Sequence, residues 1–144
     1  MLVSEVLDLK GRRIVTIDSE ASVGEAVARL VQNDVGSLPV LDDEGRLVGV
    51  ISERDVLRMM HHRGEGAGRQ KVSAVMTCNP VTCSVDDSVD EVMGLMSERR
   101  IAKIPVLERD ALVGVVSVGD VVKLMYDKVS SENRHLLSYI HGDL

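Results

Sequence analysis

Apolar residues follow the same pattern twice along the chain. Each copy has an apolar stripe at helical spacing, two short apolar runs separated by a turn, and a second helical stripe. Residues 15–50 of the first copy line up with residues 81–115 of the second. The apolar runs, which predict strands, are residues 38–41, 47–51, 104–107 and 112–116. The sequence therefore predicts an internal repeat.

The polar residues between these runs predict where the helices begin. A Ser-x-x-Glu pattern at Ser22 and at Ser88 predicts capping boxes, in which the serine accepts from the third helical amide and the glutamate returns a bond. A second helix is expected from Ser52 and from Ser117. The runs at 47–51 and 112–116 are continuously apolar, which predicts strands buried on both faces.

Each copy thus reads as strand, helix, strand, strand, helix, and neither is large enough to bury a sufficient core alone. We predict an α+β fold of two β-α-β-β-α repeats, packed with pseudo-twofold symmetry and separated by clefts. The expected segments are a lead-in with a short helix (1–13), the first repeat (14–62), a flexible glycine-bearing linker (63–74), the second repeat (75–128) and a C-terminal amphipathic helix (129–144).

Composition narrows the possible partners. The 144 residues carry a net charge of -6, no run of basic residues and only two aromatic side chains, which argues against nucleic acid. No apolar stretch approaches the roughly 18 residues of a membrane span. Cys78 and Cys83 fit neither a redox pair nor a zinc site, so we expect free thiols and a cytoplasmic location.

The candidate chemistry lies where each copy's last strand meets its second helix. Asp55 and Asp120 each follow a serine by three residues, in the first turn of the predicted helix. A carboxylate there can accept from ribose hydroxyls, and a helix N-terminus favours anions. Ser-x-x-Asp is also a capping pattern, so a purely structural role stays open. The sequence shows no nucleophile paired with a base and no set of metal ligands, so we expect neither an enzyme nor a metal site.

Three motifs together resemble a tandem pair of CBS domains (a Bateman module). They are the Gly-hydrophobic-hydrophobic-Ser-x-x-Asp endings at 49–55 and 114–120, the Pro-Val-Leu strands at 39–41 and 105–107, and Met76-Thr77 before Pro80-Val81-Thr82. The resemblance implies clefts between the repeats that bind an adenosine-containing ligand. AMP is favoured, while ADP, ATP, NAD(H) and S-adenosylmethionine stay open.

The resemblance also implies roles for individual residues. Asp55 and Asp120 would hold ribose hydroxyls, assisted by Ser52 and Ser117. Adenine would lie beside the first strand of the same repeat, at Thr16, Ile17, Asp18 and Ala21 or at Thr82, Cys83, Ser84 and Asp87. The opposite repeat would contribute Lys103, Ile104 and Pro105 to the Asp55 cleft, and Ser37, Leu38 and Pro39 to the Asp120 cleft. Because Lys103 and Arg54 add positive charge, we expect the Asp55 cleft to bind a phosphorylated adenosine more tightly.

The leading hypothesis is a non-enzymatic regulatory module that senses energy or redox state and signals in trans to an unknown client protein. A homodimer is also expected, with helical stripes through Val56, Met60, Val121 and Met125 as its face. The alternative is a structural or dimerisation scaffold with vestigial clefts.

Overall fold

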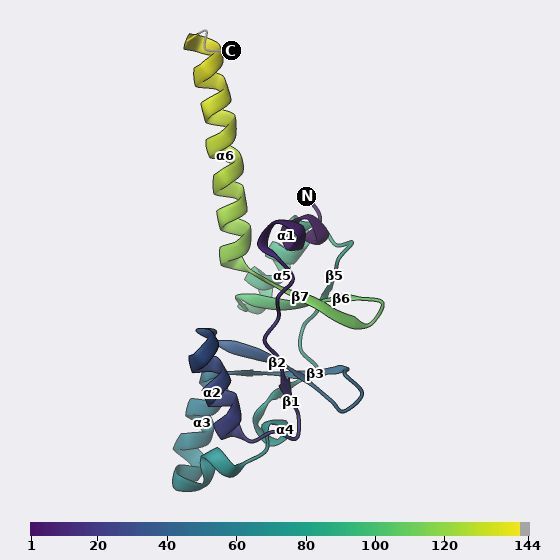
Figure 1. The fold of residues 1–144 in the computed structure, drawn as a ribbon, viewed down its shortest axis with the longest axis vertical. Coiled ribbons are helices and arrows are strands. Elements are labelled where there is room, and N and C mark those ends of the chain that lie inside the picture. The colour runs from purple at the N-terminus through teal and green to yellow at the C-terminus, as the bar shows by residue number, and fades with distance from the viewer. Residues whose placement is uncertain (142–144) are drawn as a thin grey trace.

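The computed structural model describes residues 1–141, and the last three residues of the expected C-terminal segment lie outside this range. Figure 1 shows two sheet-and-helix halves stacked along the long axis, with one long helix extending beyond them. In chain order the elements are α1 (Val3–Lys10), β1 (Ile17–Asp18), α2 (Val23–Asn33), β2 (Ser37–Leu41), β3 (Leu47–Ser52), α3 (Glu53–Arg63), the 3-10 helix η1 (Gly64–Arg69), α4 (Val72–Val75), β4 (Thr77–Cys78), β5 (Cys83–Ser84), α5 (Val89–Arg99), β6 (Lys103–Glu108), β7 (Ala111–Ser117) and α6 (Val118–His141).

The two sheets confirm the predicted α+β repeat. The first has strand order β1-β2-β3-β4 and the second β5-β6-β7. In both, the first strand runs parallel to the second and the third runs antiparallel to it. Pro39 pairs with Val50 in one sheet, and Pro105 pairs with Val115 in the other. The equivalent registers place equivalent residues on equivalent faces.

The strands β3 and β7 are not buried on both faces, so that prediction was wrong. Gly49 and Ile51 of β3 are buried, whereas Val50 between them is only half-buried. The burial pattern of β7 is the same. The reason is that one face of each sheet packs on its helices while the other faces the space between the repeats.

The predicted caps at Ser22 and Ser88 are half formed. Each serine Oγ accepts from a backbone amide three residues later, at 3.1 Å. Among residues 1–141, neither partner glutamate returns a recorded bond. Reciprocal boxes form instead at the second helices, where Asp55 and Asp120 each accept from the backbone N–H of the preceding cap serine.

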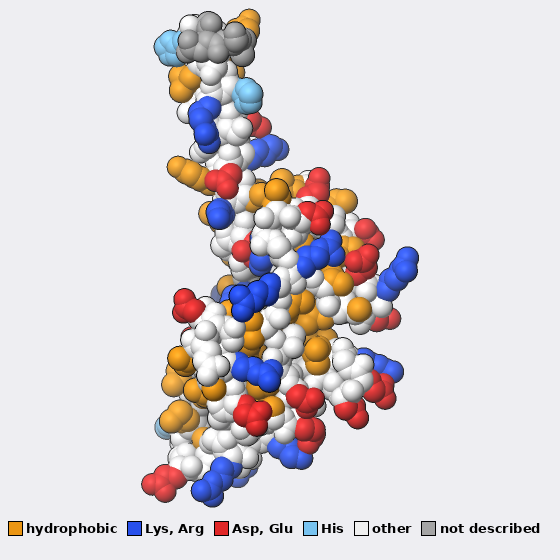
Figure 2. Space-filling model, in the orientation of Figure 1, with side chains coloured by type: hydrophobic (Ala, Val, Ile, Leu, Met, Phe, Trp, Pro, Cys, Tyr) orange, Lys and Arg blue, Asp and Glu red, His pale blue; other side chains and the backbone are white. Residues whose placement is uncertain are grey.

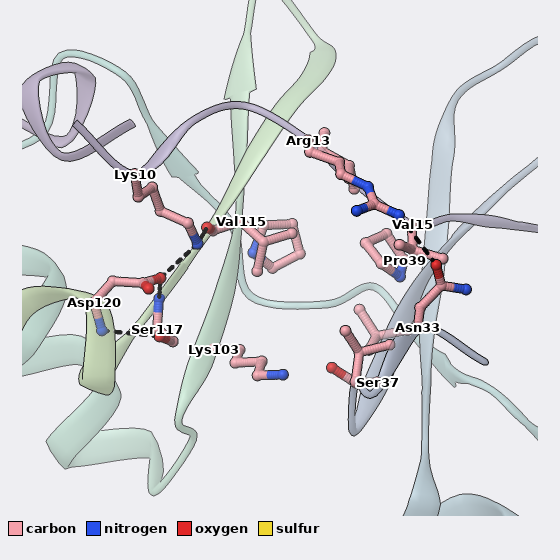
Figure 3. Close-up of a pocket in the computed structure, with 14 residues that line it drawn as sticks. Lys10, Arg13, Val15, Asn33, Ser37, Pro39, Lys103, Val115, Ser117 and Asp120 are labelled. Atoms are coloured by element: carbon pink, nitrogen blue, oxygen red, sulfur yellow. Dashed lines mark hydrogen bonds and ion pairs between the residues drawn. The ribbon is translucent and has the colours of Figure 1, made fainter. Parts of the chain in front are cut away.

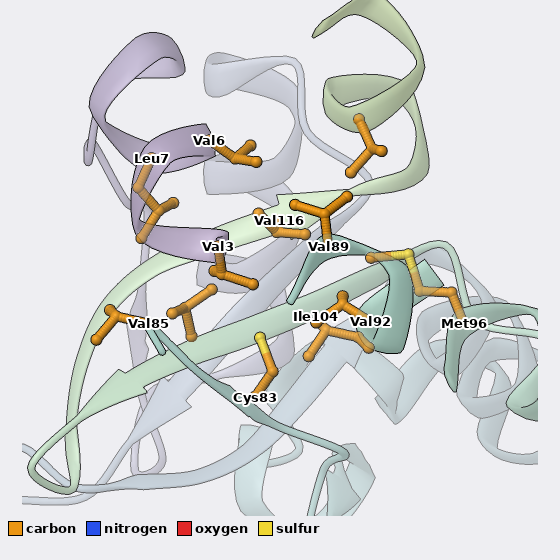
Figure 4. Close-up of a cluster of buried hydrophobic side chains, with 12 residues drawn as sticks. Val3, Val6, Leu7, Cys83, Val85, Val89, Val92, Met96, Ile104 and Val116 are labelled. Atoms are coloured by element: carbon orange, nitrogen blue, oxygen red, sulfur yellow. The ribbon is translucent and has the colours of Figure 1, made fainter. Parts of the chain in front are cut away.

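The hydrophobic cores do not follow chain order, because the core of each repeat includes a segment that precedes the other repeat in the sequence. Val3, Val6 and Leu7 of α1 pack in the core of the second repeat (Figure 4). Val72 of α4 is fully buried in the core of the first, and β4 extends the first sheet by pairing with β3. The two halves therefore share segments as well as an interface.

The segment between the repeats is ordered, which contradicts the expected flexible linker. Residues 64–69 form η1, and Ala67 within it is only 3% exposed. The chain just after η1 is tied to the start of α2, since Val23 N donates to Gln70 O and Val72 N donates to Ala21 O, both at 2.8 Å. Burial of Ala67 and these bonds remove the freedom that three glycines suggest.

Helix α6 is continuous from Val118 to His141, so the expected C-terminal helix is an extension of the second repeat's last helix. Leu136 and Ile140 on the extension are 62% and 71% exposed, so this part does not dock on its own domain. The expected dimer stripe was also partly wrong, because Val56 and Val121 are buried in their own cores. Within residues 1–141, none of the helices combines the length and the apolar character that a membrane span requires.

Candidate functional site

A cavity of about 340 Å³ lies between the two sheets, and both repeats and the lead-in contribute to its lining. Figure 3 shows its side chains converging from β7 and α6 on one side and from β2 and α2 on the other. The lining residues are Lys10, Arg13, Ile14, Val15, Asn33, Val35, Ser37, Pro39, Val50, Lys103, Pro105, Val115, Ser117 and Asp120.

The walls of the cavity are apolar and nearly symmetric. Pro39 and Val50 come from the first sheet, and Pro105 and Val115 occupy the equivalent positions of the second. Val50 and Val115, both half-buried, belong to the continuously apolar runs at residues 47–51 and 112–116 of the sequence. Apolar surfaces on two sides with a few polar groups around them suit a small, partly flat ligand.

Asp120 is the carboxylate of this cavity, and two groups hold it. Its Oδ2 accepts from the Ser117 backbone N–H at 2.9 Å and from Lys10 Nζ at 2.5 Å. Lys10 Nζ also donates to the Val115 carbonyl at 2.6 Å. Lys10 belongs to the last turn of α1, so the lead-in helix brings a cation to the N-terminus of α6.

The surroundings of Asp120 keep it ionised. Partial burial alone would raise its pKa, but the bonds from Lys10 and Ser117 and the positive charge of Lys10 outweigh burial and lower the pKa below the usual value of 3.8. The carboxylate is therefore negative at neutral pH. It offers Oδ1 as an acceptor, since the recorded bonds from Lys10 and Ser117 both go to Oδ2.

Positive charge exceeds negative charge in the cavity, although the whole chain is acidic. Lys10, Arg13 and Lys103 line it together with the single carboxylate of Asp120. Arg13 Nη2 donates to Asn33 Oδ1 at 3.3 Å, and among the described residues Lys103 has no recorded carboxylate partner. Lys and Arg side chains gather at the level where the two halves meet in Figure 2. Such a site attracts an anionic ligand.

The cavity brings together only part of the residue set expected from the sequence. The expected residues that line it are Ser37, Pro39, Lys103, Pro105, Ser117 and Asp120. Four others are buried in the hydrophobic cores: Ile17, Leu38, Cys83 and Ile104. Thr16, Asp18, Ala21 and Thr82 lie at or near the first strands and are not among the residues that line the cavity. The ligand-binding roles expected for these eight residues stay predictions.

Lys103 lies in the cavity of Asp120, which differs from its expected place opposite Asp55. The register explains the difference, because Lys103 pairs with Ser117 across β6 and β7. Ser117 is the cap residue of the helix that carries Asp120, so the register brings Lys103 to the cavity of these two residues. In Figure 3 Lys103 points into the space between the sheets.

Asp55 has a plainer environment than Asp120. Its Oδ2 accepts from Ser52 N at 2.8 Å and from Ser52 Oγ at 3.0 Å, which completes the capping box. Arg54 is exposed on the first turn of α3. Neither Asp55 nor Arg54 lines the cavity described above, so tighter binding at Asp55 stays a prediction.

Eight lining residues were missed by sequence reasoning: Lys10, Arg13, Ile14, Val15, Asn33, Val35, Val50 and Val115. Lys10 and Arg13 were overlooked because residues 1–13 read as a lead-in outside the repeats. One signal was present, since Lys10-Gly-Arg-Arg places three basic residues immediately before an apolar run. Its meaning depends on where α1 docks, which local sequence does not specify.

The site supplies binding groups: a charged acceptor, three cations and apolar walls. Cys83, one of the residues expected beside adenine, is not among the lining residues. Burial raises the pKa of its thiol to about 11, with a smaller contribution from Asp87. Within residues 1–141, no group of three or more His, Cys, Asp or Glu side chains is placed to hold a metal ion. Cys78 and Cys83 are both free, as expected.

Known proteins match both the sequence and this architecture. The family model described as "CBS domain" matches residues 3–62 and 72–127. A mitochondrial CBS domain-containing protein of Arabidopsis thaliana, CBSX3, is 32% identical, with 97% of this chain and 72% of that protein covered. The crystal structure of the CBS-domain containing protein ATU1752 from Agrobacterium tumefaciens superposes with a TM-score of 0.79 at 37% identity, covering 85% of this chain and 91% of that one.

One solved relative contains ligands. The CBS domain pair of protein MJ0100, in complex with 5'-methylthioadenosine and S-adenosyl-L-methionine, gives a TM-score of 0.76 at 29% identity, covering 89% of this chain and 98% of that one. The repeat, the two sheets, the paired Ser-x-x-Asp caps and the family match agree. The chain belongs to the CBS-domain family and is a tandem pair of CBS domains, which is a regulatory module.

Proposed function

We propose that this CBS pair binds an adenosine-containing ligand with an anionic group in the cavity at Asp120, and that occupancy of the cavity is read by a client protein. The observation that carries the proposal is an ionised Asp120 paired with Lys10 in an apolar-walled cavity that Arg13 and Lys103 also line. The ligand is a regulator and not a substrate in this proposal.

Each part of such a ligand has a matching group in the cavity. The ribose diol donates to Asp120, whose Oδ1 is not used by Lys10 or Ser117. The anionic group lies among the basic side chains, where charge-assisted bonds are strongest. The base packs between the proline and valine walls. The adenosine ligands of the MJ0100 pair support the choice of nucleoside, and the three basic lining residues favour a phosphorylated one such as AMP.

A ligand in this position would change the relative stability of two arrangements of the halves. It would touch both sheets and α1 at once, since all three contribute lining residues. A ligand shifts such an equilibrium by its difference in affinity for the two arrangements. The position of α1 and the angle between the sheets are therefore the properties that a client protein would read.

The test begins with the purified chain. Denaturation and mass spectrometry identify any small molecule carried through purification, and absorbance at 260 nm is informative because the chain has no Trp and only two Tyr. The emptied protein is then titrated calorimetrically with AMP, ADP, ATP, NAD(H) and S-adenosylmethionine. We expect binding near one ligand per chain and a loss of roughly 10- to 100-fold in affinity for Asp120→Ala, because a charged acceptor is removed.

Asp55→Ala is the matched control, since it removes the equivalent capping carboxylate of the other repeat. Equal losses of affinity in both variants would show that the ligand does not bind specifically in the Asp120 cavity. An absence of binding across the panel would overturn the proposal and favour the scaffold alternative.

A further inference from the structure

The exposed face of α6 repeats every seven residues along the part of the helix that leaves the body. Apolar side chains recur with alternating spacings of four and three residues, which is the seam pattern of a two-stranded coiled coil. In heptad notation the d positions are Val122, Val129 and Leu136, and the a positions are Tyr126, Asn133 and Ile140. The five apolar members of this seam are each 53% to 71% exposed.

The other side of α6 already has its neighbour. Near the body, the residues of α6 that face α1 across a shallow pocket are Lys123, Leu124, Asp127 and Lys128, all outside the seam. Farther along, the outer positions are polar: Ser131, Arg134, His135 and Ser138. The helix is therefore apolar on one side only, and α1 packs on a different side.

Asn133 identifies what covers the seam. In a parallel, in-register pair of helices each a residue packs against the same residue of the partner, so Asn133 meets a second Asn133 and the two amides bond. In an antiparallel pair an a residue packs against a d residue, and Asn133 would be buried against Val129 or Leu136 without a partner. A single asparagine at an a position therefore favours two parallel strands in one register.

The positions beside the seam agree with a second copy of the chain. In a parallel pair a g residue meets the e residue five positions later in the partner. The interchain pairs formed in this way are Met125 with Ser130 and Glu132 with Leu137, so no two like charges lie beside each other. From Val122 to Ile140 the seam is roughly 28 Å long at 1.5 Å per residue.

We infer that α6 is an interchain helix: two copies of the chain associate through a parallel coiled coil along residues 122–140, with Asn133 setting the register. This places the two CBS pairs side by side at the same end of the coiled coil. The surface differs from the face expected from sequence, because it lies mainly beyond the second repeat and does not use Val56 or Val121. It is independent of the ligand proposal.

Cysteine cross-linking of the full chain tests the inference. In a Cys78→Ser background, Tyr126→Cys places a thiol at an a position close to the body. In the parallel pair the two introduced thiols face each other, and oxidation should link nearly all of the protein as a dimer. In an antiparallel pair with Asn133 against Val129 of the partner, residue 126 lies opposite residue 136 of the partner. The two introduced thiols are then about ten residues, or roughly 15 Å, apart along the helix axis, and no link forms. Ser131→Cys, on the outer face, is the matched control and should stay unlinked.

Light scattering of the unmodified chain supplies the second measurement. We expect the native chain to be a dimer. Leu136→Asp should raise the dissociation constant of the dimer at least tenfold, so that monomer forms, whereas Ser138→Asp should leave the chain dimeric. Leu136 is 62% exposed and outside both cores, so the variant should keep the melting behaviour of the CBS pair. A monomeric native chain, or a dimer in which Tyr126→Cys links no more than Ser131→Cys, would overturn the inference.

Discussion

The two repeats have nearly the same frame and different chemistry at the same position. Asp55 and Asp120 occupy equivalent capping boxes, with serine amide to carboxylate distances of 2.8 and 2.9 Å. Only Asp120 also pairs with a lysine, and that lysine belongs to α1 and not to either repeat. α1 contacts the second sheet at Gly114, whereas the equivalent Gly49 of the first sheet faces Met76 and pairs with β4. The segments that precede the repeats, more than the repeats themselves, make the two clefts different.

The largest predicted difference between the halves concerns the two thiols. Cys78 on β4 is exposed, whereas Cys83 on β5 is buried and its pKa is raised to about 11 by burial and by Asp87. At pH 8 roughly one Cys83 thiol in a thousand is ionised, and the thiolate is the reactive form. We expect iodoacetamide to modify Cys78 at least 100-fold faster, as measured by peptide mass spectrometry. Labelling at equal rates in the folded protein would contradict the burial of Cys83; unfolding in denaturant should abolish the difference.

The second prediction compares the equivalent glycines Gly49 and Gly114. A methyl group added at Gly49 would lie 2.8 Å from the Thr77 carbonyl oxygen, which is backbone, whereas one added at Gly114 would meet only the ends of the Leu7 side chain at 2.7 Å. Since a side chain yields more readily than a strand, Gly49→Ala should lower the free energy of unfolding by about 3 kcal/mol and Gly114→Ala by about 1 kcal/mol.

Thermal melting measures both effects, at about 4 °C for each kcal/mol. Gly94→Ala on α5 is the control, because a methyl group there meets nothing within 4 Å. A larger loss at Gly114 than at Gly49 would show that α1 is held more rigidly than β4.

The third prediction concerns the charge that α1 brings to the Asp120 cavity. Lys10→Met removes one of the three cations there, so affinity for AMP should fall by roughly tenfold while affinity for uncharged adenosine changes little. Lys71→Met is the control, since it breaks the exposed ion pair with Glu20 beside the first repeat. Calorimetric titration with both ligands distinguishes the outcomes, and an equal loss for AMP and adenosine would assign Lys10 a role in shape and not in charge.

The smallest predicted effect is the pH dependence of the Lys10 and Asp120 pair. The pKa of Asp120 is lower in the folded protein than its usual 3.8, so the pair stabilises the fold above about pH 3.8 and this stabilisation is lost as pH falls through the lower folded value. Because both side chains are partly exposed, the contribution is about 1 kcal/mol or less.

Urea unfolding of the native chain and of Lys10→Met at several pH values checks this sign. The two stability curves should differ by a constant amount near neutral pH and converge in acid. A difference that grew as pH fell would mean that Lys10 acts through another group.

Local patterns predicted the repeated elements well, because caps and strand alternation depend on residues close in the chain. Ser22, Ser52, Ser88 and Ser117 all lie at the starts of helices, as expected. The patterns did not predict in which repeat's hydrophobic core α1 would pack. Val3, Val6 and Leu7 show an apolar face, but the sheet that covers this face is formed about 100 residues later.

The candidate site was predicted in part for the same reason. Asp120 and Ser117 were found because a motif marks them. Lys103 was assigned to the other cleft, because its neighbours depend on strand register, and Lys10 was missed, because its contact spans 105 residues. Distinguishing the seam of α6 from an ordinary amphipathic surface needs the knowledge that the helix continues past the body.

The exchange of sealing segments has a consequence for the protein during its synthesis. Helix α1 leaves the ribosome about 100 residues before its partner strand β7, which begins at Ala111. At a translation rate of about 5–20 residues per second, the apolar face of α1 waits for roughly 5–20 seconds. During that interval the nascent chain exposes Val3, Val6 and Leu7, so a chaperone that shields short apolar helices should bind it before the second sheet is complete.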